Sequence, residues 1–263
     1  MSAPGLLRRQ TQNIASIEHV PWSTGMIQPV DILAIAAHRD DVEQTCGGTL
    51  LHSSSIGLRT AILDLTQGEA GTRGTAAERA AEAEEAAKIL GAAWRHALDL
   101  PDGRLENSWE NRLKIATVLR QAQPRVVILP YWQARHPDHA ITATLGYEAC
   151  FVAGLAKVAT DAPPHRPFKI LYASLYAEVR PTFVVDITAY IEQRFQSLMA
   201  YRSQYENQAS GGKIFVPREE IRERTFALAR FYGMLGGVRY AEPFVQKEIG
   251  LVEDLTLIPV QSI

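Results

Sequence analysis

Cysteine is scarce in this chain of 263 residues, which contains only Cys46 and Cys150. Two isolated cysteines exclude a disulfide framework as the basis of the fold, and they cannot form a thiolate zinc cluster. A bound metal ion would therefore have to be held by imidazole and carboxylate groups. The same scarcity is typical of a reducing compartment, so the sequence predicts a cytoplasmic protein.

Long hydrophobic runs are also missing, although 46% of the residues are hydrophobic. No stretch approaches the roughly 18 apolar residues that a membrane span requires, so a membrane partner is not expected. Residues 1–28 lack the apolar run of a signal peptide, and their prolines, glycines and polar residues predict an irregular N-terminal extension. Nothing in 29–263 resembles a linker, which favours a single domain there.

The chain also has no large excess of charge of one sign. It contains 27 Lys and Arg residues and 29 Asp and Glu residues, for a net charge of −2. A nucleic-acid-binding face is normally basic, so no nucleic-acid partner is expected. The sequence also lacks the G-x-G-x-x-G that a dinucleotide-dependent oxidoreductase carries after its first strand. Acidic residues occupy that place here, which argues against this class of enzyme.

What the sequence does contain is an alternation of buried strands and helices. Apolar runs predict strands at 30–37, 58–66, 94–100 and 125–130, and helical patterns fill 42–55, 76–90, 111–123 and 139–157. The second half predicts strands at 169–176 and 182–187, helices at 189–205 and 219–236, and a loop at 208–217. The alternation favours right-handed βαβ units, and hence a Rossmann-like α/β fold with a mostly parallel sheet flanked by helices.

Ligands of an open parallel sheet bind outside the carboxyl ends of the strands, so the loops after the first four strands are the candidate site. These loops contain residues 38–41, 67–75, 101–103 and 131–139. Two of them carry most of the metal-capable side chains, as His38-Arg39-Asp40-Asp41 and His136-Pro137-Asp138-His139. Taken alone, each motif could equally well be structural, the first as a capped helix start and the second as an X-Pro turn with a capping Asp. Their common position at strand ends favours a metal site.

The candidate ligands outnumber the coordination places of a catalytic zinc ion, which takes three protein ligands and leaves one place open. His38 and Asp41 are three residues apart at a strand-to-helix turn, where both can face one point. His139 begins the helix after the fourth strand and supplies the third ligand in this interpretation.

The remaining polar residues of the two motifs then have catalytic roles. Asp40 is expected beside the metal-bound water as a general base. His136 is expected near the scissile carbonyl, where an imidazolium would stabilise the oxyanion and protonate a leaving amine. Asp138 is expected to accept a hydrogen bond from His136 and keep it cationic.

The two motifs resemble the A-H-x-D-D and H-P-D-H signatures of the PIG-L/LmbE-like family of zinc-dependent N-acetylglucosamine deacetylases. The resemblance implies the LmbE-like fold, one zinc ion per chain with Fe²⁺ as the alternative cellular metal, and a small amino-sugar conjugate as substrate. It implies His38, Asp41 and His139 as ligands, and so settles which histidine of the second motif binds zinc. Relatives are often homo-oligomers, up to hexamers. Arg39 replaces the proline of many members and is expected to point away from the metal.

Further segments extend the resemblance over residues 31–244. Residues 66–75 are similar to the family's glycine-rich loop, and Arg79 begins the next helix at a position that implies substrate binding. Arg73 is either solvated or part of a guanidinium clamp for substrate carboxylates. Glu69 either caps its loop or binds a sugar hydroxyl. Residues 201–204 and 236–244 resemble the branch that deacetylates N-acetylglucosaminyl malate in bacillithiol biosynthesis.

The sequence therefore predicts a metal-dependent N-deacetylase, a hydrolase of a linear amide bond, that acts on an N-acetylglucosaminyl conjugate. N-acetylglucosaminyl malate is the expected substrate. A chitin fragment or a mycothiol-type precursor is the alternative within the hydrolases. A sugar-binding protein that has kept the scaffold without catalysis is the alternative outside them.

Overall fold

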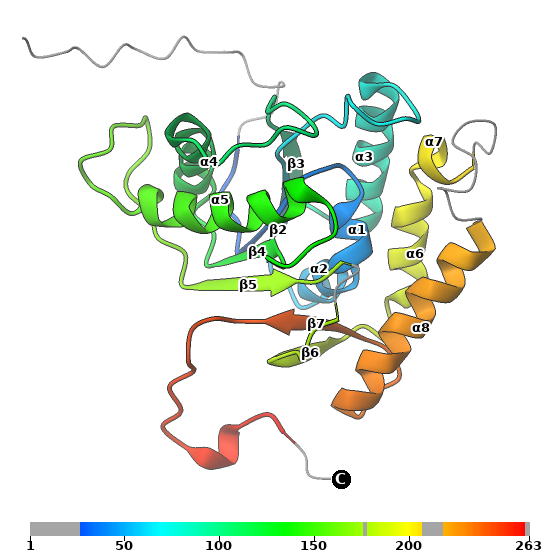
Figure 1. Ribbon diagram of the computed structural model, residues 1–263. Coiled ribbons are helices and arrows are strands. Elements are labelled where there is room, and N and C mark those ends of the chain that lie inside the picture. Colours follow the sequence, from blue (N-terminus) through cyan, green and yellow to red (C-terminus); the bar gives the residue numbers. More distant parts are fainter. Residues whose placement is uncertain (1–26, 176–177, 207–217, 261–263) are drawn as a thin grey trace, which may run out of the picture.

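A sheet of seven strands runs through the part of the protein that the structure describes, with helices on both of its faces (Figure 1). The computed structural model describes residues 27–175, 178–206 and 218–260. The strands are β1 (Ile32–Ala36), β2 (Thr60–Asp64), β3 (Trp94–Ala97), β4 (Val126–Pro130), β5 (Lys169–Ala173), β6 (Phe183–Asp186) and β7 (Ala241–Val245). The helices are α1 (Asp41–Thr45), α2 (Gly47–Ser55), α3 (Ala76–Leu90), α4 (Trp109–Ala122), α5 (Pro137–Ala153), α6 (Ile191–Met199), α7 (Arg202–Tyr205) and α8 (Arg218–Gly236), followed by the 3₁₀ turn η2 (Leu255–Leu257).

The strand order β3-β2-β1-β4-β5-β7-β6 confirms the predicted mostly parallel α/β fold. Strands β1 to β5 are parallel to one another, and β7 runs antiparallel to both β5 and β6. Strand β1 pairs with β2 on one side and with β4 on the other, so the chain order reverses at β1. The loops after β1 and β4 therefore leave the same edge of the sheet side by side, at the position where such folds bind ligands.

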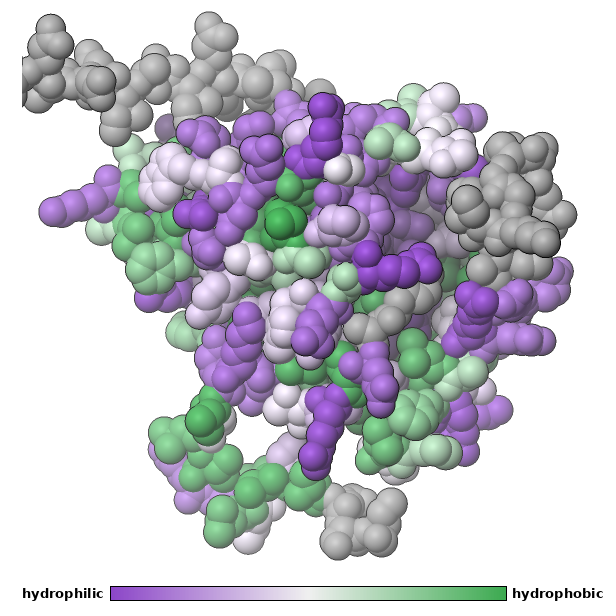
Figure 2. All heavy atoms as spheres, viewed as in Figure 1, coloured by the Kyte–Doolittle hydropathy of each residue, from purple (hydrophilic) through white to green (hydrophobic). Residues whose placement is uncertain are grey.

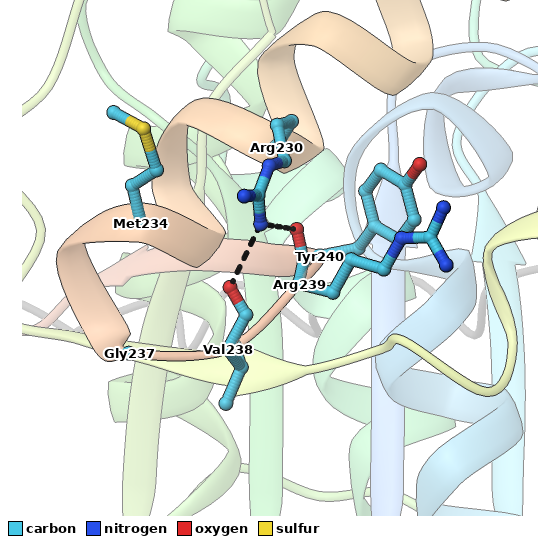
Figure 3. A pocket seen from close by; sticks show the side chains of 6 residues that line it. All are labelled: Arg230, Met234, Gly237, Val238, Arg239 and Tyr240. Atoms are coloured by element: carbon cyan, nitrogen blue, oxygen red, sulfur yellow. Dashed lines mark hydrogen bonds between the residues drawn. The ribbon is translucent and has the colours of Figure 1, made fainter.

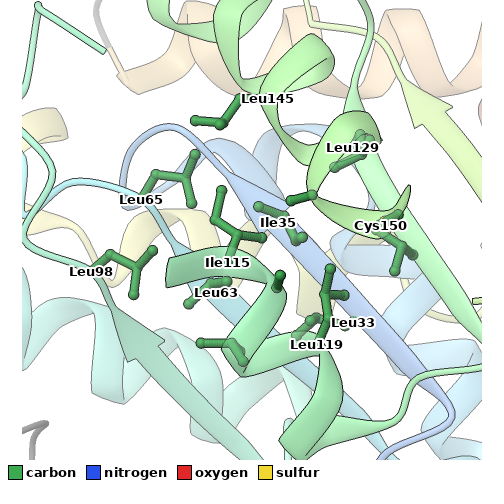
Figure 4. Packing of buried hydrophobic residues seen from close by; sticks show 14 of the residues in the cluster. Leu33, Ile35, Leu63, Leu65, Leu98, Ile115, Leu119, Leu129, Leu145 and Cys150 are labelled. Carbon is green, nitrogen blue, oxygen red and sulfur yellow. The ribbon is translucent and has the colours of Figure 1, made fainter. Parts of the chain in front are cut away.

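Alternate residues of the central strands supply two separate cores. Leu33 and Ile35 pack with residues of α4 and α5 on one face (Figure 4). Ile32 and Ala34 pack with residues of α2 and α3 on the other. This alternation follows from the period of two residues in a strand, and it explains why the strand sequences are apolar throughout.

Two predicted helices are divided in the structure, and one strand was not predicted. The predicted helix 42–55 is divided at Cys46, whose φ of −140° ends α1 before α2 begins. A Cβ on Gly48 would lie 2.8 Å from Ile187 Cγ2, so α2 needs this glycine to approach the segment after β6. The predicted helix 189–205 is likewise divided into α6 and α7. Strand β7 was not predicted, because its five residues include Pro243, which is unusual in a strand between two others.

Helix α3 shows how local sequence fixes an element. Thr75 caps its start, accepting a hydrogen bond from the Glu78 amide while the Glu78 side chain returns to the Thr75 amide. Gly91 ends it in the left-handed conformation with φ 68°. Both signals are standard helix boundaries, and the predicted helix 76–90 is confirmed.

Cys46 and Cys150 are free, as expected, and both are buried in the hydrophobic cores. Among the helices of the described ranges, none combines the length and the apolar character that crossing a bilayer requires. Of the expected extension 1–28, residues 1–26 lie outside the described residues, as does the predicted loop 208–217.

Candidate metal centre

The loops after β1 and β4 bring the three predicted ligands to one point. His38 and Asp41 lie on the turn between β1 and α1, and His139 lies in the first turn of α5. His38 Nδ1 is 3.2 Å from His139 Nε2 and 3.6 Å from Asp41 Oδ2. His139 Nε2 is 3.2 Å from Asp41 Oδ1. One nitrogen of each imidazole and the two oxygens of Asp41 therefore lie within 3.6 Å of a neighbour, and we refer to His38, Asp41 and His139 as the ligand triangle.

The triangle has the dimensions of a metal site. Metal–ligand bonds of about 2.0–2.1 Å in tetrahedral geometry place neighbouring ligand atoms ~3.3 Å apart. The three residues are also buried, with exposed fractions of 8% for His38, 7% for Asp41 and 8% for His139. Two imidazoles and one carboxylate, with a fourth position open, are a donor set typical of a catalytic zinc ion. The residues present fit a divalent metal ion.

The other ring nitrogen of His38 is held by two carboxylates. Its Nε2 lies 3.1 Å from Asp102 Oδ1 and 3.3 Å from Asp138 Oδ2. Burial disfavours the charged ring, but hydrogen bonds to Asp102 and Asp41 outweigh it and raise the pKa of His38 to about 11. The carboxylates therefore make this site attractive to a cation, and they orient the ring so that Nδ1 faces the other two ligands.

Sequence reasoning did not single out Asp102. Its second oxygen accepts a hydrogen bond from the Ala70 amide at 3.0 Å, and its own amide donates to Glu69 Oε1 at 2.8 Å. It thus joins the loop after β3 to the loop after β2 and to His38. The signal was present, because 101–103 is one of the four strand-end loops of the sequence.

The predicted pairing of Asp138 with His136 is wrong. The Asp138 carboxylate accepts hydrogen bonds from the amides of Gly103 at 2.8 Å and Leu105 at 3.3 Å, besides its contact with His38. His136 instead caps α5, its Nδ1 accepting from the Asp138 amide at 3.2 Å. Burial, together with the nearby His38 and His139, lowers the pKa of His136, so Asp138 does not hold it cationic. The first turn of a helix has backbone amides without an acceptor, and the His136 ring accepts from one of them.

His136 nonetheless lies at the metal centre. Its ring centroid is 4.7 Å from that of His38 and 5.2 Å from that of His139. The residue itself is exposed, unlike the two histidines beside it. The structure thus places this imidazole on the solvent side of the ligand triangle, where a bound molecule can reach it.

Asp40 lies between the metal ligands in sequence but belongs to a different network. Its backbone has φ 96°, a left-handed conformation that is costly for any residue other than glycine. Its Oδ2 accepts a hydrogen bond from the Tyr205 hydroxyl at 2.9 Å, and its Oδ1 is 3.7 Å from Arg79 Nη2. Burial raises the pKa of Asp40 to about 6, although Arg79 acts in the opposite direction. This pKa suits a group that accepts and returns protons near neutral pH.

The predicted substrate-binding arginines are turned towards the protein. Arg79 is 5% exposed and donates from Nη2 to the Arg39 carbonyl at 2.7 Å and from Nη1 to the Gly68 carbonyl at 3.3 Å. Arg73 is 6% exposed and donates to the Gln204 carbonyl at 2.8 Å. Both guanidinium groups therefore brace the glycine-rich loop, and substrate binding by Arg79 and Arg73 stays a prediction.

Two further residues of this region also serve the loop. Glu69 accepts the Asp102 amide, which agrees with the loop-capping alternative rather than with a sugar hydroxyl as its partner. Arg39 is buried and donates to the carbonyls of Gln67 at 3.2 Å and Ala76 at 2.8 Å. Arg39 therefore points away from the metal ligands, as predicted, and ties the first motif to the start of α3.

An open hollow at the end of α8 is a separate feature (Figure 3). It is lined by Arg230, Met234, Gly237, Val238, Arg239 and Tyr240. None of these residues carries a carboxylate or an imidazole, and Arg230 donates to the carbonyls of Val238 at 3.5 Å and Arg239 at 3.1 Å. The hollow lacks the groups that a metal-dependent reaction needs, so the candidate site remains at the β1–β4 edge.

The fold and this donor set define an α/β protein with a candidate metal site at the switch point of its sheet, and comparison with known proteins identifies its family. The sequence profile of the PIG-L family, GlcNAc-PI de-N-acetylase, matches residues 33–150. The diacetylchitobiose deacetylase of Thermococcus kodakarensis is 32% identical over 226 residues, which cover 80% of each chain. The chain belongs to the PIG-L family.

Two solved structures are similar in both sequence and fold. The conserved protein TT1542 from Thermus thermophilus is 40% identical, with a TM-score of 0.77 over 85% of this chain and 97% of that one. The N,N′-diacetylchitobiose deacetylase from Pyrococcus horikoshii is 29% identical, with a TM-score of 0.71 over 81% of this chain and 82% of that one. The expected family and the LmbE-like fold are therefore both confirmed.

Proposed function

We propose that this protein is a metal-dependent N-deacetylase that hydrolyses the acetamide of an N-acetylglucosaminide to the free amine and acetate. The observation that carries the proposal is the cluster of His38, Asp41 and His139, next to which Asp40 follows in the same turn of the chain. Membership of the PIG-L family and the deacetylase activity named for two relatives support the same reaction.

His38, Asp41 and His139 would hold the ion, for which zinc fits the donor set and Fe²⁺ is the cellular alternative. A divalent ion bound there polarises a carbonyl and lowers the pKa of a bound water to about 7. Asp40 takes the proton of the attacking water, a role that suits a buried carboxyl whose pKa is raised to about 6. The same carboxyl then carries this proton to the departing amine.

His136 binds the acetyl oxygen in this mechanism. Its Nδ1 is occupied by the capping hydrogen bond from the Asp138 amide, which leaves Nε2 to donate to the oxygen on which negative charge develops. Its lowered pKa favours a neutral donor over an imidazolium. Of the two proton donors that the sequence left open, this geometry supports Asp40, and it assigns Asp138 to holding His38.

A chitin fragment or a similar uncharged glycoside is the substrate class that we favour. Two relatives act on diacetylchitobiose, whose aglycone is a second amino sugar. The malate conjugate would need cationic groups for its carboxylates, but Arg73 and Arg79 are buried and donate to backbone carbonyls. The bacillithiol substrate expected from residues 201–204 and 236–244 is therefore the less favoured candidate.

A panel of N-acetylglucosaminides with different aglycones tests the proposal. The purified protein is incubated with diacetylchitobiose, N-acetylglucosaminyl malate and a mycothiol-type precursor, and free amine is measured with and without a chelator. Release from diacetylchitobiose that stops on chelation and returns with zinc is expected. No release from any member of the panel, at full metal occupancy, would favour the non-catalytic sugar-binding alternative.

We also propose that residues 29–263 form one domain and that the protein is a cytoplasmic homo-oligomer, up to a hexamer, whose only other partner is the small substrate. A cluster of exposed aliphatic side chains supports self-association: Figure 2 shows apolar surface on the C-terminal segment, which contains Leu251, Leu255 and Leu257. Apolar patches of this kind are unusual on a monomer. Sedimentation equilibrium measures the assembly, and a monomer at micromolar concentration would contradict it.

A further inference from the structure

Tyr205 reaches the metal centre from a distant part of the chain. It is the last residue of α7, and its hydroxyl donates to Asp40 Oδ2 at 2.9 Å. The other Asp40 oxygen faces Arg79 Nη2 at the longer distance of 3.7 Å. The Tyr205 hydrogen bond is therefore the shortest contact that orients this carboxylate, and the mechanism above gives Tyr205 no part.

Helix α7 has only four residues, and side chains of other elements hold it in place. Ser203 donates its amide and its hydroxyl to the two oxygens of Glu82 on α3, both at 2.7 Å. Gln204 Nε2 donates to the Arg73 carbonyl at 2.7 Å, while Arg73 Nη1 donates to the Gln204 carbonyl at 2.8 Å. We refer to these contacts of Arg73, Glu82, Ser203 and Gln204 as the α7 clasp.

The glycine-rich loop is shaped to admit the clasp. Gly74 has φ 70°, and a Cβ at this position would lie 2.6 Å from Ser203 Oγ. A larger residue would push α7 away from the loop, and Tyr205 with it. The sequence relates residues 201–204 to substrate choice. In the structure, Ser203 and Gln204 of this segment form hydrogen bonds within the protein, and Tyr205, which contacts Asp40, follows directly.

Asp40 is a group whose orientation needs such support. Its side chain is short, its backbone is left-handed, and it does not belong to the ligand triangle that fixes His38 and Asp41. A carboxylate that must accept a proton from one direction loses efficiency when it samples others. The Tyr205 hydroxyl occupies Oδ2 and selects one orientation.

We infer that Tyr205 is a positioning residue that holds the Asp40 carboxylate for proton transfer, and that the α7 clasp fixes Tyr205 for this purpose. The inference rests on the proposed deacetylase function. The Tyr205 ring also packs against a buried cluster that includes Ala83 and Ala86 of α3. Phenylalanine keeps that packing, so Tyr205→Phe removes the hydroxyl that donates to Asp40.

The test compares Tyr205→Phe with Tyr190→Phe, which also removes a hydrogen-bonded hydroxyl, one that donates to Ser55 Oγ at 2.7 Å on the surface. For Tyr205→Phe on diacetylchitobiose, kcat is expected to fall about 10-fold, with KM, zinc content and melting temperature unchanged. Tyr190→Phe is expected to match the parent in all four. An unchanged kcat for Tyr205→Phe, or a fall explained by lost zinc or lost stability, would overturn the inference.

A double-mutant cycle tests the role of the clasp. Gln204→Ala is expected to lower kcat by a smaller factor than Tyr205→Phe, and the double variant is expected to be no slower than Tyr205→Phe, because both changes act through one hydrogen bond. If the fall in kcat of the double variant equals the product of the falls in the two single variants, the link between the clasp and Tyr205 is overturned. An inactive parent protein would refute the proposed function, whereas an active parent with an equally active Tyr205→Phe would refute only the positioning role.

Discussion

The loop after β1 and the glycine-rich loop after β2 both follow parallel strands at the same edge of the sheet, but their polar side chains have different partners. Both are polar and both leave the carboxyl edge of parallel strands. In the first, His38 and Asp41 turn towards a shared point. In the second, Arg73 is buried and its guanidinium donates to a backbone carbonyl. Strand ends therefore locate a site, but whether a side chain serves the site or the loop depends on which backbone groups need partners.

The largest effect is expected from breaking the ligand triangle itself. His139→Ala removes one of the three proposed protein ligands, so bound zinc and deacetylase activity should both be almost lost. Zinc is measured by elemental analysis and activity by amine release. The matched control is His52→Ala on α2, outside the site, which should retain both. Full zinc content in His139→Ala would show that the triangle is not the metal site.

The next effect separates metal binding from proton transfer within the β1 loop. Asp40→Asn keeps the shape of the side chain but removes the base, so turnover should fall by about 10²–10⁴-fold while zinc content stays that of the parent. Steady-state kinetics with elemental analysis on the same sample measures both quantities. Turnover at the parent rate would exclude Asp40 as the base.

A smaller effect is expected where the loop after β3 supports the first loop. Asp102→Asn weakens the contact that orients His38 through Nε2, and it should lower zinc affinity by about 10–100-fold. Competition with a chromophoric chelator at fixed pH measures this. The control is Asp99→Asn, whose carboxylate contacts Lys114 at 3.3 Å on the surface. Equal zinc affinity for Asp102→Asn and the parent would mean that Asp138 alone suffices to orient His38.

The smallest effect concerns stability and addresses the glycine-rich loop. Gly68 has φ 73°, and a Cβ there would lie 2.3 Å from Arg79 Nη1, so Gly68→Ala should cost about 2–4 kcal/mol of unfolding free energy. Gly57 has φ 87° with open space around it, so Gly57→Ala should cost only about 1 kcal/mol. Denaturant unfolding of both variants measures the difference. Equal costs would mean that the loop is not packed on Arg79.

Much of the fold was predictable because its signals are local. The apolar runs of β1, β2 and β4 and the helical pattern of α3 are read from neighbouring residues, and each predicted element is confirmed. The division of the predicted helix at Cys46 was not predictable in this way. Next to the break, Gly48 meets Ile187 and Glu242, which both lie more than 100 residues further along the chain.

In the candidate site, too, some features follow from short segments of sequence and others from contacts between distant segments. Which residues carry metal-binding chemistry, and that they follow parallel strands, was determined by the sequence alone, because side-chain chemistry and strand periodicity are properties of short segments. Only the tertiary structure decided that Asp102 holds His38, that Arg79 braces a loop and that Tyr205 reaches Asp40. Such contacts depend on which buried donors and acceptors the folded chain brings within hydrogen-bonding distance. Residues far apart in the chain form no sequence pattern from which these contacts could be predicted.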